Sequence, residues 1–369
     1  MKVWVTVMPE YLAPGVYIEE VAFGAHPIEG VSTSEAGFIG ASESPQLLSG
    51  ITSVADFRRQ VPSDSSAYLS SAVDGFFKNG GTRCFVALIA ATEPLEAALE
   101  ALSGEPVSIL CCPDENLFTD AARVMTEHCE RRKDRFCILQ SPQPIVQIAT
   151  HEPPVHSSYA AYYHPWLVVT AFDRITRLTV PPGGHVAGVY ARTDMQGRIW
   201  KSSAGARIDG GTALSQNVES VDADLLLERG IDVLRNEPGQ GIVVWGAMTT
   251  STDQNWRYVN VRRLLIFLER SIDRGLQWVV SESYGSALWE SVRTVIDVFL
   301  LNLWKSGALR GQTADEAYFV RCDRTTMTQD DMDNGRLIAL AGVAPLRPAE
   351  FVILRIICQS ERGARANRT

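Results

Sequence analysis

The first residues that could do chemistry are two histidines placed around a glutamate. His151 and His156 flank Glu152, and imidazole and carboxylate groups are common zinc ligands. The histidines are an i, i+5 pair in a proline-containing loop, where no helix or strand would fix the ligand geometry. We therefore expect structural histidines and no metal ion.

Two other stretches look like ligand-binding loops. Gly183 and Gly184 would let a backbone approach a phosphate, but two prolines precede them and favour a rigid turn. Residues 330–335 begin like a calcium loop. With its glycine at the sixth position, Met332 stands at the third and Ala341 at the twelfth, where oxygen ligands are needed. Both matches fail, so we expect no cofactor.

Catalytic motifs are equally absent from the sequence. It contains no Walker loop, no GxGxxG and no GxSxG elbow, and nothing groups its serine, histidine and aspartate residues into a triad. We therefore expect a protein that is not an enzyme.

Composition and charge further narrow the class of protein. The 369 residues suggest two domains, or one core with an insertion. A formal charge of −9 disfavours binding of nucleic acid, which needs neutralisation of its phosphates. The seven cysteines form no CxxC pair, which is typical of buried thiols in a reducing compartment. Neither a signal peptide nor a stretch of ~20 apolar residues is visible, so we expect synthesis in the cytoplasm and no membrane insertion.

The elements between residues 25 and 241 indicate a mixed α/β body. Short apolar runs of the buried-strand type alternate with helical stretches, which favours a largely parallel sheet with crossover helices. Residues 180–185 are expected to be a loop. The expected strands are residues 36–41, 83–91, 107–112, 136–139 and 166–169, and the expected helices are residues 54–61, 67–79 and 120–132.

The strongest helical patterns lie between residues 242 and 344, after an expected strand at 242–246. Leu264, Leu265, Leu268 and Ile272 form an apolar face on a helix over residues 260–274. A second amphipathic helix covers residues 288–305. A capping box at residues 328–331 starts a short helix, and strands are expected at 318–322, 337–343 and 351–358.

Both ends of the chain look like arms. In residues 1–24, Val16, Ile18 and Val21 suggest a strand for which the neighbouring sequence offers no partner. Such a strand either frays or pairs with a distant sheet edge, including one on another chain. Residues 345–369 form a second arm, with a strand bounded by prolines and then an arginine-containing tail without apolar pattern.

Motifs distributed along nearly the whole chain closely resemble those of contractile tail sheath proteins, the family of phage tail sheaths, R-type pyocin sheaths and sheaths of extracellular contractile injection systems. The motifs are YLAPGVYIEE (11–20), AGFIG (36–40), GGTRCFV (80–86), SYAAYYHPW (158–166), PPGGHVAGVYARTD (181–194), WRYVNVRR (256–263), FLLNLWKSGALRG (299–311), TMTQDDMDNGRL (326–337) and GVAPLRPAEFVILRI (342–356). Residues 201–210 and 279–286 depart from the usual pattern.

The resemblance implies an α/β (α+β) chain of the compact kind. Its mixed-sheet body with crossover helices would be the subtilisin-like-fold region, 25–241, followed by a C-terminal α/β sheath domain, 242–344. Extended N-terminal (1–24) and C-terminal (345–369) strand arms would be exchanged between subunits.

The resemblance also implies residues for that exchange. A strand that leaves its own subunit gains backbone hydrogen bonds and register from a neighbour's sheet. The receiving strand would contain Leu337, Ile338 and Leu340. The exchanged residues would be Val16, Tyr17, Ile18, Val21, Phe351, Val352, Ile353, Leu354 and Ile356.

Further partners follow from the same resemblance. The chain would form a helical homo-oligomer, with six-fold rings, that contracts around an inner tube and contacts baseplate and terminator proteins and sheath paralogues. The polar side of the helix over residues 288–305, with Glu290, Arg293, Asp297 and Lys305, would face the tube; a solvated helix face is the alternative. The particle would be assembled in the cytoplasm and then act as a phage tail or extracellular machine.

Two rival functions stay open at this point. A hydrolase-like α/β enzyme is conceivable because of the expected subtilisin-like region, although fold alone confers no activity. A monomeric binding module is the second rival, and it would leave both terminal strands without a role in assembly.

Overall fold

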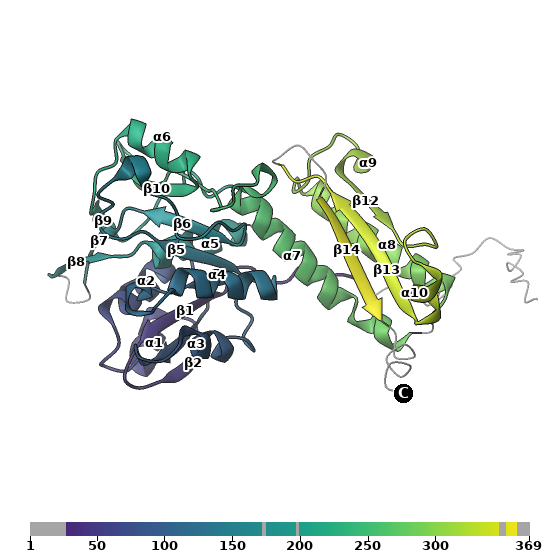
Figure 1. The fold of residues 1–369 in the computed structure, drawn as a ribbon, viewed down its shortest axis with the longest axis horizontal. Helices are drawn as coiled ribbons and strands as arrows, with labels where there is room; N and C mark the ends of the chain where they lie inside the picture. Colours follow the sequence, from purple (N-terminus) through teal and green to yellow (C-terminus); the bar gives the residue numbers. More distant parts are fainter. Residues whose placement is uncertain (1–26, 172–174, 197–198, 283, 347–351, 360–369) are drawn as a thin grey trace, which may run out of the picture.

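The computed structural model describes residues 27–171, 175–196, 199–282, 284–346 and 352–359, which form two lobes joined by helix α7 (Val259–Gly275) (Figure 1). The first lobe, called the body here, precedes α7, and the second lobe follows it. Each lobe has its own cluster of buried apolar side chains. Within the described residues no helix is long and apolar enough to cross a membrane.

The body is built on an 8-stranded sheet with the order β11-β10-β6-β5-β4-β1-β3-β2. Its inner strands pair in parallel, while β2 and β11 pair antiparallel at the two edges. This confirms the expected mixed, largely parallel sheet. The strands are β1 (Ala36–Ala41), β2 (Gln46–Ile51), β3 (Cys84–Ile89), β4 (Ile109–Cys111), β5 (Phe136–Gln140), β6 (Ala160–His164), β10 (Ile231–Glu237) and β11 (Gly241–Val244).

Helices cover both faces of this sheet, as βαβ crossovers require. Helices α2 and α5 pack together on one face, and α3 packs with α4 on the other. Serine side chains cap the first two helices: Ser53 accepts from the Asp56 amide, and Ser66 accepts from the Tyr68 and Leu69 amides. The helices are α1 (Val54–Gln60), α2 (Ala67–Lys78), α3 (Leu95–Ala101), α4 (Ala121–Arg132), α5 (Gly183–Met195) and α6 (Ser220–Glu228).

Helix α5 corrects one expectation. Residues 180–185 were expected to form a loop, but the helix begins at Gly183. A Cβ atom on Gly184 would lie 2.4 Å from the Ala72 backbone, and one on Gly188 would lie 2.4 Å from the Phe76 carbonyl oxygen. The glycines are therefore required by the close approach of α5 to α2 and not by a turn.

A small antiparallel sheet with the order β8-β7-β9 completes the body. Its central strand β7 (Leu167–Thr170) corresponds to the strand expected at residues 166–169. The outer strands are β8 (Arg177–Val180) and β9 (Gly211–Leu214).

The second lobe packs a three-stranded antiparallel sheet, β12-β13-β14, against α7 and α8. Thr328 and Asp331 form the expected capping box at the start of α10. The elements after α7 are α8 (Ser286–Lys305), α9 (Ala314–Ala317), β12 (Tyr318–Arg321), α10 (Gln329–Asp333), β13 (Arg336–Val343) and β14 (Val352–Gln359).

At two of the expected domain boundaries, residues pack with the neighbouring domain. Strand β11 pairs with β10, so residues 242–244 belong to the body sheet and not to the C-terminal domain. Ile28 lies in the apolar core of the second lobe, where it contacts Gly275 of α7, and the Val31 amide donates to the Ser271 hydroxyl. The residues before β1 therefore fasten the second lobe to the body.

Candidate functional site

The C-terminal sheet brings together most of the residues expected to act in strand exchange. Strand β14 pairs with β13 along all 8 of its residues, from Val352 opposite Val343 to Gln359 opposite Arg336. Leu354 is buried in the core of the second lobe, while Ile353 and Ile357 are 60% and 57% exposed. The alternation of a strand thus gives β14 one face on the core and one face toward solvent.

In the single chain this strand pairs with its own β13. Its exchange between subunits stays a prediction. The residues proposed as receivers are its partners: Leu337 lies opposite Cys358, Ile338 opposite Ile357 and Leu340 opposite Arg355. An isolated chain offers this strand only its own apolar edge, so the sheet closes within the subunit.

The remaining exchange residues are not part of this sheet as described. Val16, Tyr17, Ile18 and Val21 of the N-terminal arm, and Phe351 before β14, lie outside the described residues. Strand β14 ends the sheet order, and no strand among the described residues pairs with its outer edge. That edge therefore carries backbone groups that another strand could pair with.

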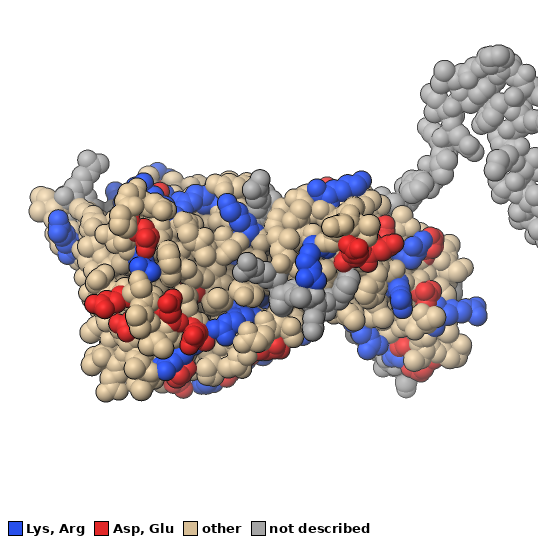
Figure 2. Space-filling view, turned by 90° about the horizontal axis from the view of Figure 1, so that it is seen from above, with Lys and Arg blue, Asp and Glu red and all other residues tan. Residues whose placement is uncertain are grey.

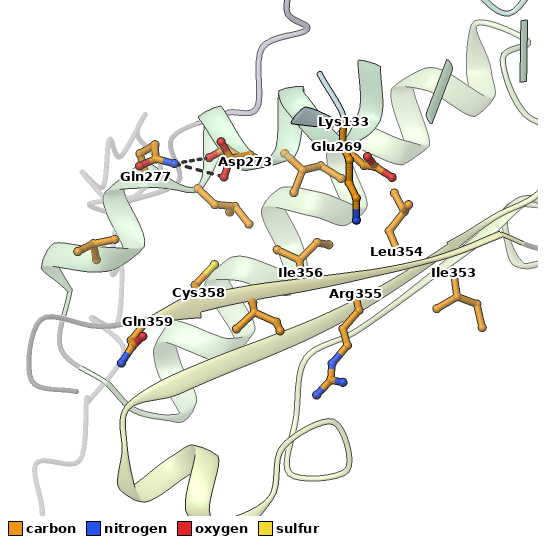
Figure 3. A pocket seen from close by; sticks show the side chains of 14 residues that line it. Lys133, Glu269, Asp273, Gln277, Ile353, Leu354, Arg355, Ile356, Cys358 and Gln359 are labelled. Atoms are coloured by element: carbon orange, nitrogen blue, oxygen red, sulfur yellow. Dashed lines mark hydrogen bonds between the residues drawn. The ribbon is translucent and has the colours of Figure 1, made fainter. Parts of the chain in front are cut away.

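A groove of about 470 Å³ follows this edge between β14 and α7 (Figure 3). Ile272, Leu276 and Leu354 give it apolar walls, and Lys133 and Glu269 add charge. Asp273 accepts a hydrogen bond from the Gln277 amide of the next turn. The groove therefore combines an open sheet edge, an apolar surface and a few charged side chains.

The polar side chains expected on α8 do not all face solvent equally. Glu290 and Lys305 are exposed, whereas Arg293 and Asp297 are half-buried. Arg293 pairs with Glu290 one turn earlier, and this hydrogen bond holds the pKa of the Glu290 carboxyl below its usual value. Val298, which the sequence analysis did not include, is 47% exposed on the same helix.

A buried ion pair fastens α7 to the body. Arg263 of α7 donates from both terminal nitrogens to Asp194 of α5, at 3.0 and 2.6 Å, and the two side chains are only 6% and 4% exposed. The Thr33 hydroxyl donates to the same carboxylate at 2.8 Å, and Arg263 also donates to the Thr33 carbonyl. Burial raises the pKa of Asp194, and Arg263 opposes that shift.

The neighbouring arginine makes a second junction. The Arg262 guanidinium lies 3.8 Å from the Trp256 ring centre and 4.4 Å from that of Tyr159, and it donates to the Ser158 hydroxyl at 2.8 Å. Burial lowers the pKa of Arg262. Stacking of this kind suits arginine because its planar cation is weakly hydrated.

No sequence pattern marks these junction residues as a unit. They lie in three of the motifs that carry the family resemblance, 158–166, 181–194 and 256–263. The available signal was the placement of charged residues, Asp194 and the pair Arg262 and Arg263, within stretches that are otherwise buried.

A buried aspartate holds together the carboxyl ends of β1 and β4. The chain leaves β1 and β4 in opposite directions, and ligands in such folds bind at the carboxyl ends of these strands. Fully buried Asp114 follows β4 and accepts hydrogen bonds from the Ala41 amide, at 2.9 Å, and from the Ser66 hydroxyl. Both carboxylate oxygens therefore hold the sheet edge to the start of α2.

One serine and histidine pair does occur nearby. Ser141 and His164 are joined by a 2.8 Å hydrogen bond, but each is 1% exposed, and the Ser141 carbonyl accepts from Trp166. The described residues place no carboxylate in hydrogen-bond contact with His164. Both side chains are buried and hydrogen bonded to each other, which fits a structural role.

The two histidines first considered as zinc ligands hydrogen bond to different groups. His151 hydrogen bonds to the Tyr162 hydroxyl, and His156 hydrogen bonds to the Thr250 carbonyl. Among the described residues no three metal-ligating side chains are grouped around a common point.

Buried histidines predict a loss of stability in acid. Burial lowers the pKa of both His164 and His185 to about 4, so these rings fold in the neutral form. Because the unfolded chain takes up these protons first, the stability that neutral histidines contribute should fall as the pH drops from about 6.5 to about 4, by at most about 3 kcal/mol each.

The measurement is the difference in free energy of unfolding between the native chain and His185→Asn, from urea titrations across this pH range. Burial raises the pKa of Glu115 to about 7, so the contribution of this carboxyl to stability should rise as the pH falls. Glu115 is present in both chains, so its contribution cancels in the difference between them. A difference that does not change with pH would contradict a neutral, buried His185.

Charge on the surface is mixed. On the face seen in Figure 2, lysine and arginine side chains are interspersed with acidic ones over both lobes. Among the described residues on this face there is thus no broad basic track of the kind that phosphate backbones require.

Comparison with known proteins identifies the family. Residues 90–250 match the phage tail sheath protein central domain, and residues 251–359 match the phage tail sheath C-terminal domain. The helical sheath of the anti-feeding prophage in the contracted state is 32% identical, with a TM-score of 0.76 and 94% of this chain and 99% of that chain covered.

Two further relatives support the same family. The contracted sheath complex of the extracellular contractile injection system PVC is 30% identical, with a TM-score of 0.76 and coverage of 95% of this chain and 98% of that chain. The tail sheath protein of Vibrio phage KVP40 is 27% identical over 185 residues, which make up 49% of this chain but only 27% of that relative's length. The chain therefore belongs to the contractile phage tail sheath family.

Proposed function

We propose that this chain is the structural subunit of a contractile sheath, which polymerises helically around an inner tube and shortens to drive the tube through a target envelope. The observation that carries the proposal is the open-edged C-terminal sheet, whose last strand is the end of the described chain. The likeness to two sheaths in the contracted state, over nearly the whole chain, supports it.

Strand exchange is the proposed mechanism of assembly. The pairing of β14 with β13 would open, and β14 of another copy would take the same register opposite Leu337, Ile338 and Leu340. Every backbone pair lost within the chain is then regained between chains, as in domain swapping. A chain that donates one strand and accepts another makes a head-to-tail contact that extends into a helix instead of closing as a dimer.

Contraction would then use rigid subunits joined by paired strands. The extended sheath would be a trapped state, and gains of about 1–3 kcal/mol per subunit would add along the filament. Such a machine needs neither a nucleotide nor catalysis. We therefore propose a non-enzymatic subunit, and labelling of the pure protein by a serine-reactive probe would contradict this.

The proposed partners are the inner tube, baseplate and terminator proteins, and sheath paralogues. A 6-fold symmetrised baseplate structure of the anti-feeding prophage contains a chain 33% identical to this one, which supports rings of six subunits and contact with a baseplate. Assembly in the cytoplasm, followed by action as a phage tail or an extracellular particle, completes the proposal.

Removal of residues 1–23 tests the assembly. We expect the truncated chain to stay folded but monomeric, because the second lobe loses a strand that only a neighbour supplies. Size-exclusion chromatography and negative-stain microscopy report the polymer, and circular dichroism reports the fold. Unchanged polymers from the truncated chain would refute strand exchange by the N-terminal arm.

Charge reversal on α8 tests the tube contact. Arg293→Glu together with Lys305→Glu should shorten sheaths assembled on tubes in the extended state, because polar contacts hold the tube until it slides. Arg59→Glu on α1 of the body, whose side chain is 72% exposed, is the matched control. If the sheaths on tubes keep their length, the polar side of α8 faces solvent and does not contact the tube.

A further inference from the structure

The C-terminal sheet has a second face, which points away from the core of its lobe. Leu354 lies on the core side of β14, whereas Ile353 and Arg355 lie on the other side (Figure 3). Residues paired across neighbouring strands have their side chains on the same face of a sheet. The pairing of the three strands therefore groups two arginines with four apolar residues, and this group is called the outer sheet face here. Its members are Phe319, Arg321, Leu340, Ile353, Arg355 and Ile357.

The outer sheet face carries an excess of positive charge. Helix α10 places its carboxylates at one end of the sheet, where Arg336 pairs with two of them. At the open end, Arg355 is exposed and forms no ion pair within the described residues. Asp323 lies close to Arg321, but hydrogen bonds from Thr325 are the main reason why the pKa of this aspartate is lowered. The open part thus combines two cations with one carboxylate that is already hydrogen bonded.

Helix α6 of the body presents a surface of opposite character. Leu226 is buried in the body, so the opposite side of the helix faces solvent. That side carries Val221, Asp224, Leu225 and Glu228, whose i, i+3, i+4, i+7 spacing places them in one stripe along the helix. All four are exposed, and Val221 is 72% exposed. This set is called the α6 stripe here, and it is apolar and acidic.

The arginines nearest the α6 stripe are engaged by other groups. Arg229 pairs with Glu152, and Arg257 donates to two backbone carbonyls at the end of α6. Within the described residues, neither Asp224 nor Glu228 belongs to an ion pair. The stripe therefore keeps two carboxylates that a basic partner could pair with.

The two surfaces cannot meet within one chain. Helix α6 belongs to the body and β14 to the second lobe, with α7 between them (Figure 1). The 17 residues of α7 make a helix of about 25 Å, anchored in both lobes. A chain that carries both surfaces so far apart can bring them together only with another copy of itself.

We propose that the outer sheet face of one copy packs on the α6 stripe of a second copy. The isoleucines of β14 contact Val221 and Leu225, and the two arginines pair with the two carboxylates of the stripe. Arg321 and Arg355 are two strands apart, which is roughly 10 Å, and the carboxylates are one helical turn apart, roughly 6 Å. The long arginine side chains span this difference.

This inference rests on the proposed assembly and adds to it a contact that does not involve the terminal arms. A single stripe is too small to hold a dimer, since stable interfaces bury about 1,200–2,000 Å². Because the two surfaces differ, each copy offers both, and the contact repeats along a helical polymer instead of closing. A β14 exchanged in the same register leaves the composition of the outer sheet face unchanged.

Cross-linking tests the contact directly. Asp224→Cys and Arg321→Cys are made on separate full-length chains, both with Cys358→Ser because Cys358 is the native cysteine that is not fully buried. A short bis-maleimide should link the mixture into dimers about tenfold more than either chain alone, because docked cysteines react at a high effective concentration. Glu96→Cys on α3, in place of Asp224→Cys, is the control and should give no such increase.

Charge reversal tests the pairing. Asp224→Arg together with Glu228→Arg should raise the critical concentration for polymerisation about tenfold, and adding Arg321→Glu and Arg355→Glu should restore it to within about threefold. The matched control reverses Glu96 and Glu100, an exposed i, i+4 acidic pair on α3, and should change the critical concentration less than about twofold. Circular dichroism checks that each variant is folded.

The outcomes separate this inference from the proposed function. If chains that polymerise give no link, or if the reversed charges have no effect or are not rescued, the docking is overturned while strand exchange stands. A reversal that shortens sheaths only when tubes are present assigns the α6 stripe to the tube and also overturns the docking. A native chain that does not polymerise overturns this inference and the proposed function together.

Discussion

Replacing Arg263 with alanine is expected to lower the free energy of unfolding by about 3–5 kcal/mol, because it leaves the Asp194 carboxylate buried without its cation. The loss should be smaller at pH 5 than at pH 8. Without Arg263 the pKa of Asp194 rises further, so its protonated form, which burial tolerates better, is more populated in acid. Urea unfolding followed by circular dichroism measures both values.

Two variants make this expectation specific. Arg293→Ala removes an arginine from the exposed pair with Glu290, whose side chains are 43% and 64% exposed, and should cost no more than about 0.5 kcal/mol. In a double-mutant cycle, Arg263→Ala should cost much less when Asp194 is already asparagine. Additive losses would show that Arg263 acts through packing and not through the ion pair.

Gly188→Ala is expected to destabilise the chain by about 2–3 kcal/mol even though alanine favours helices over glycine. The added methyl group would lie 2.4 Å from the Phe76 carbonyl oxygen, and a backbone atom inside α2 cannot move without shifting the helix. Thermal unfolding provides the measurement, with valine at the same position expected to be worse than alanine.

Gly104→Ala is the control for this substitution. A Cβ atom at Gly104 would have no atom within 4 Å, so the change should be nearly neutral. If Gly188→Ala were as stable as the native chain, α2 and α5 would have to separate more easily than their close packing indicates.

The body illustrates what sequence patterns can predict. Continuous apolar runs such as Phe136–Gln140 are buried on both faces of a parallel sheet, and this is why their strands were predictable. The edge strand β2 was not placed because it is short and mixed in polarity. Helix α5 was mistaken for a loop at its start, since glycine signals a turn and a close helix contact equally well.

The candidate site shows where sequence reasoning ends. The pattern of residues 352–358 predicted a strand, but no local pattern determines which sheet edge this strand pairs with. In the single chain it pairs with β13. Lys133 lines the groove beside β14, and no local pattern could show this because its position depends on how the body meets α7. The arginine and aspartate of the lobe junction lie 69 positions apart in sequence, so no local pattern connects them.

Helix α7 begins among the contacts of the body and ends under β14, so one continuous element is anchored in both lobes. A hydrogen-bonded helix resists bending far better than a loop does. Because this one helix packs in both lobes, a rotation imposed on the second lobe should carry the body with it, and little of the motion should be lost to bending between the lobes.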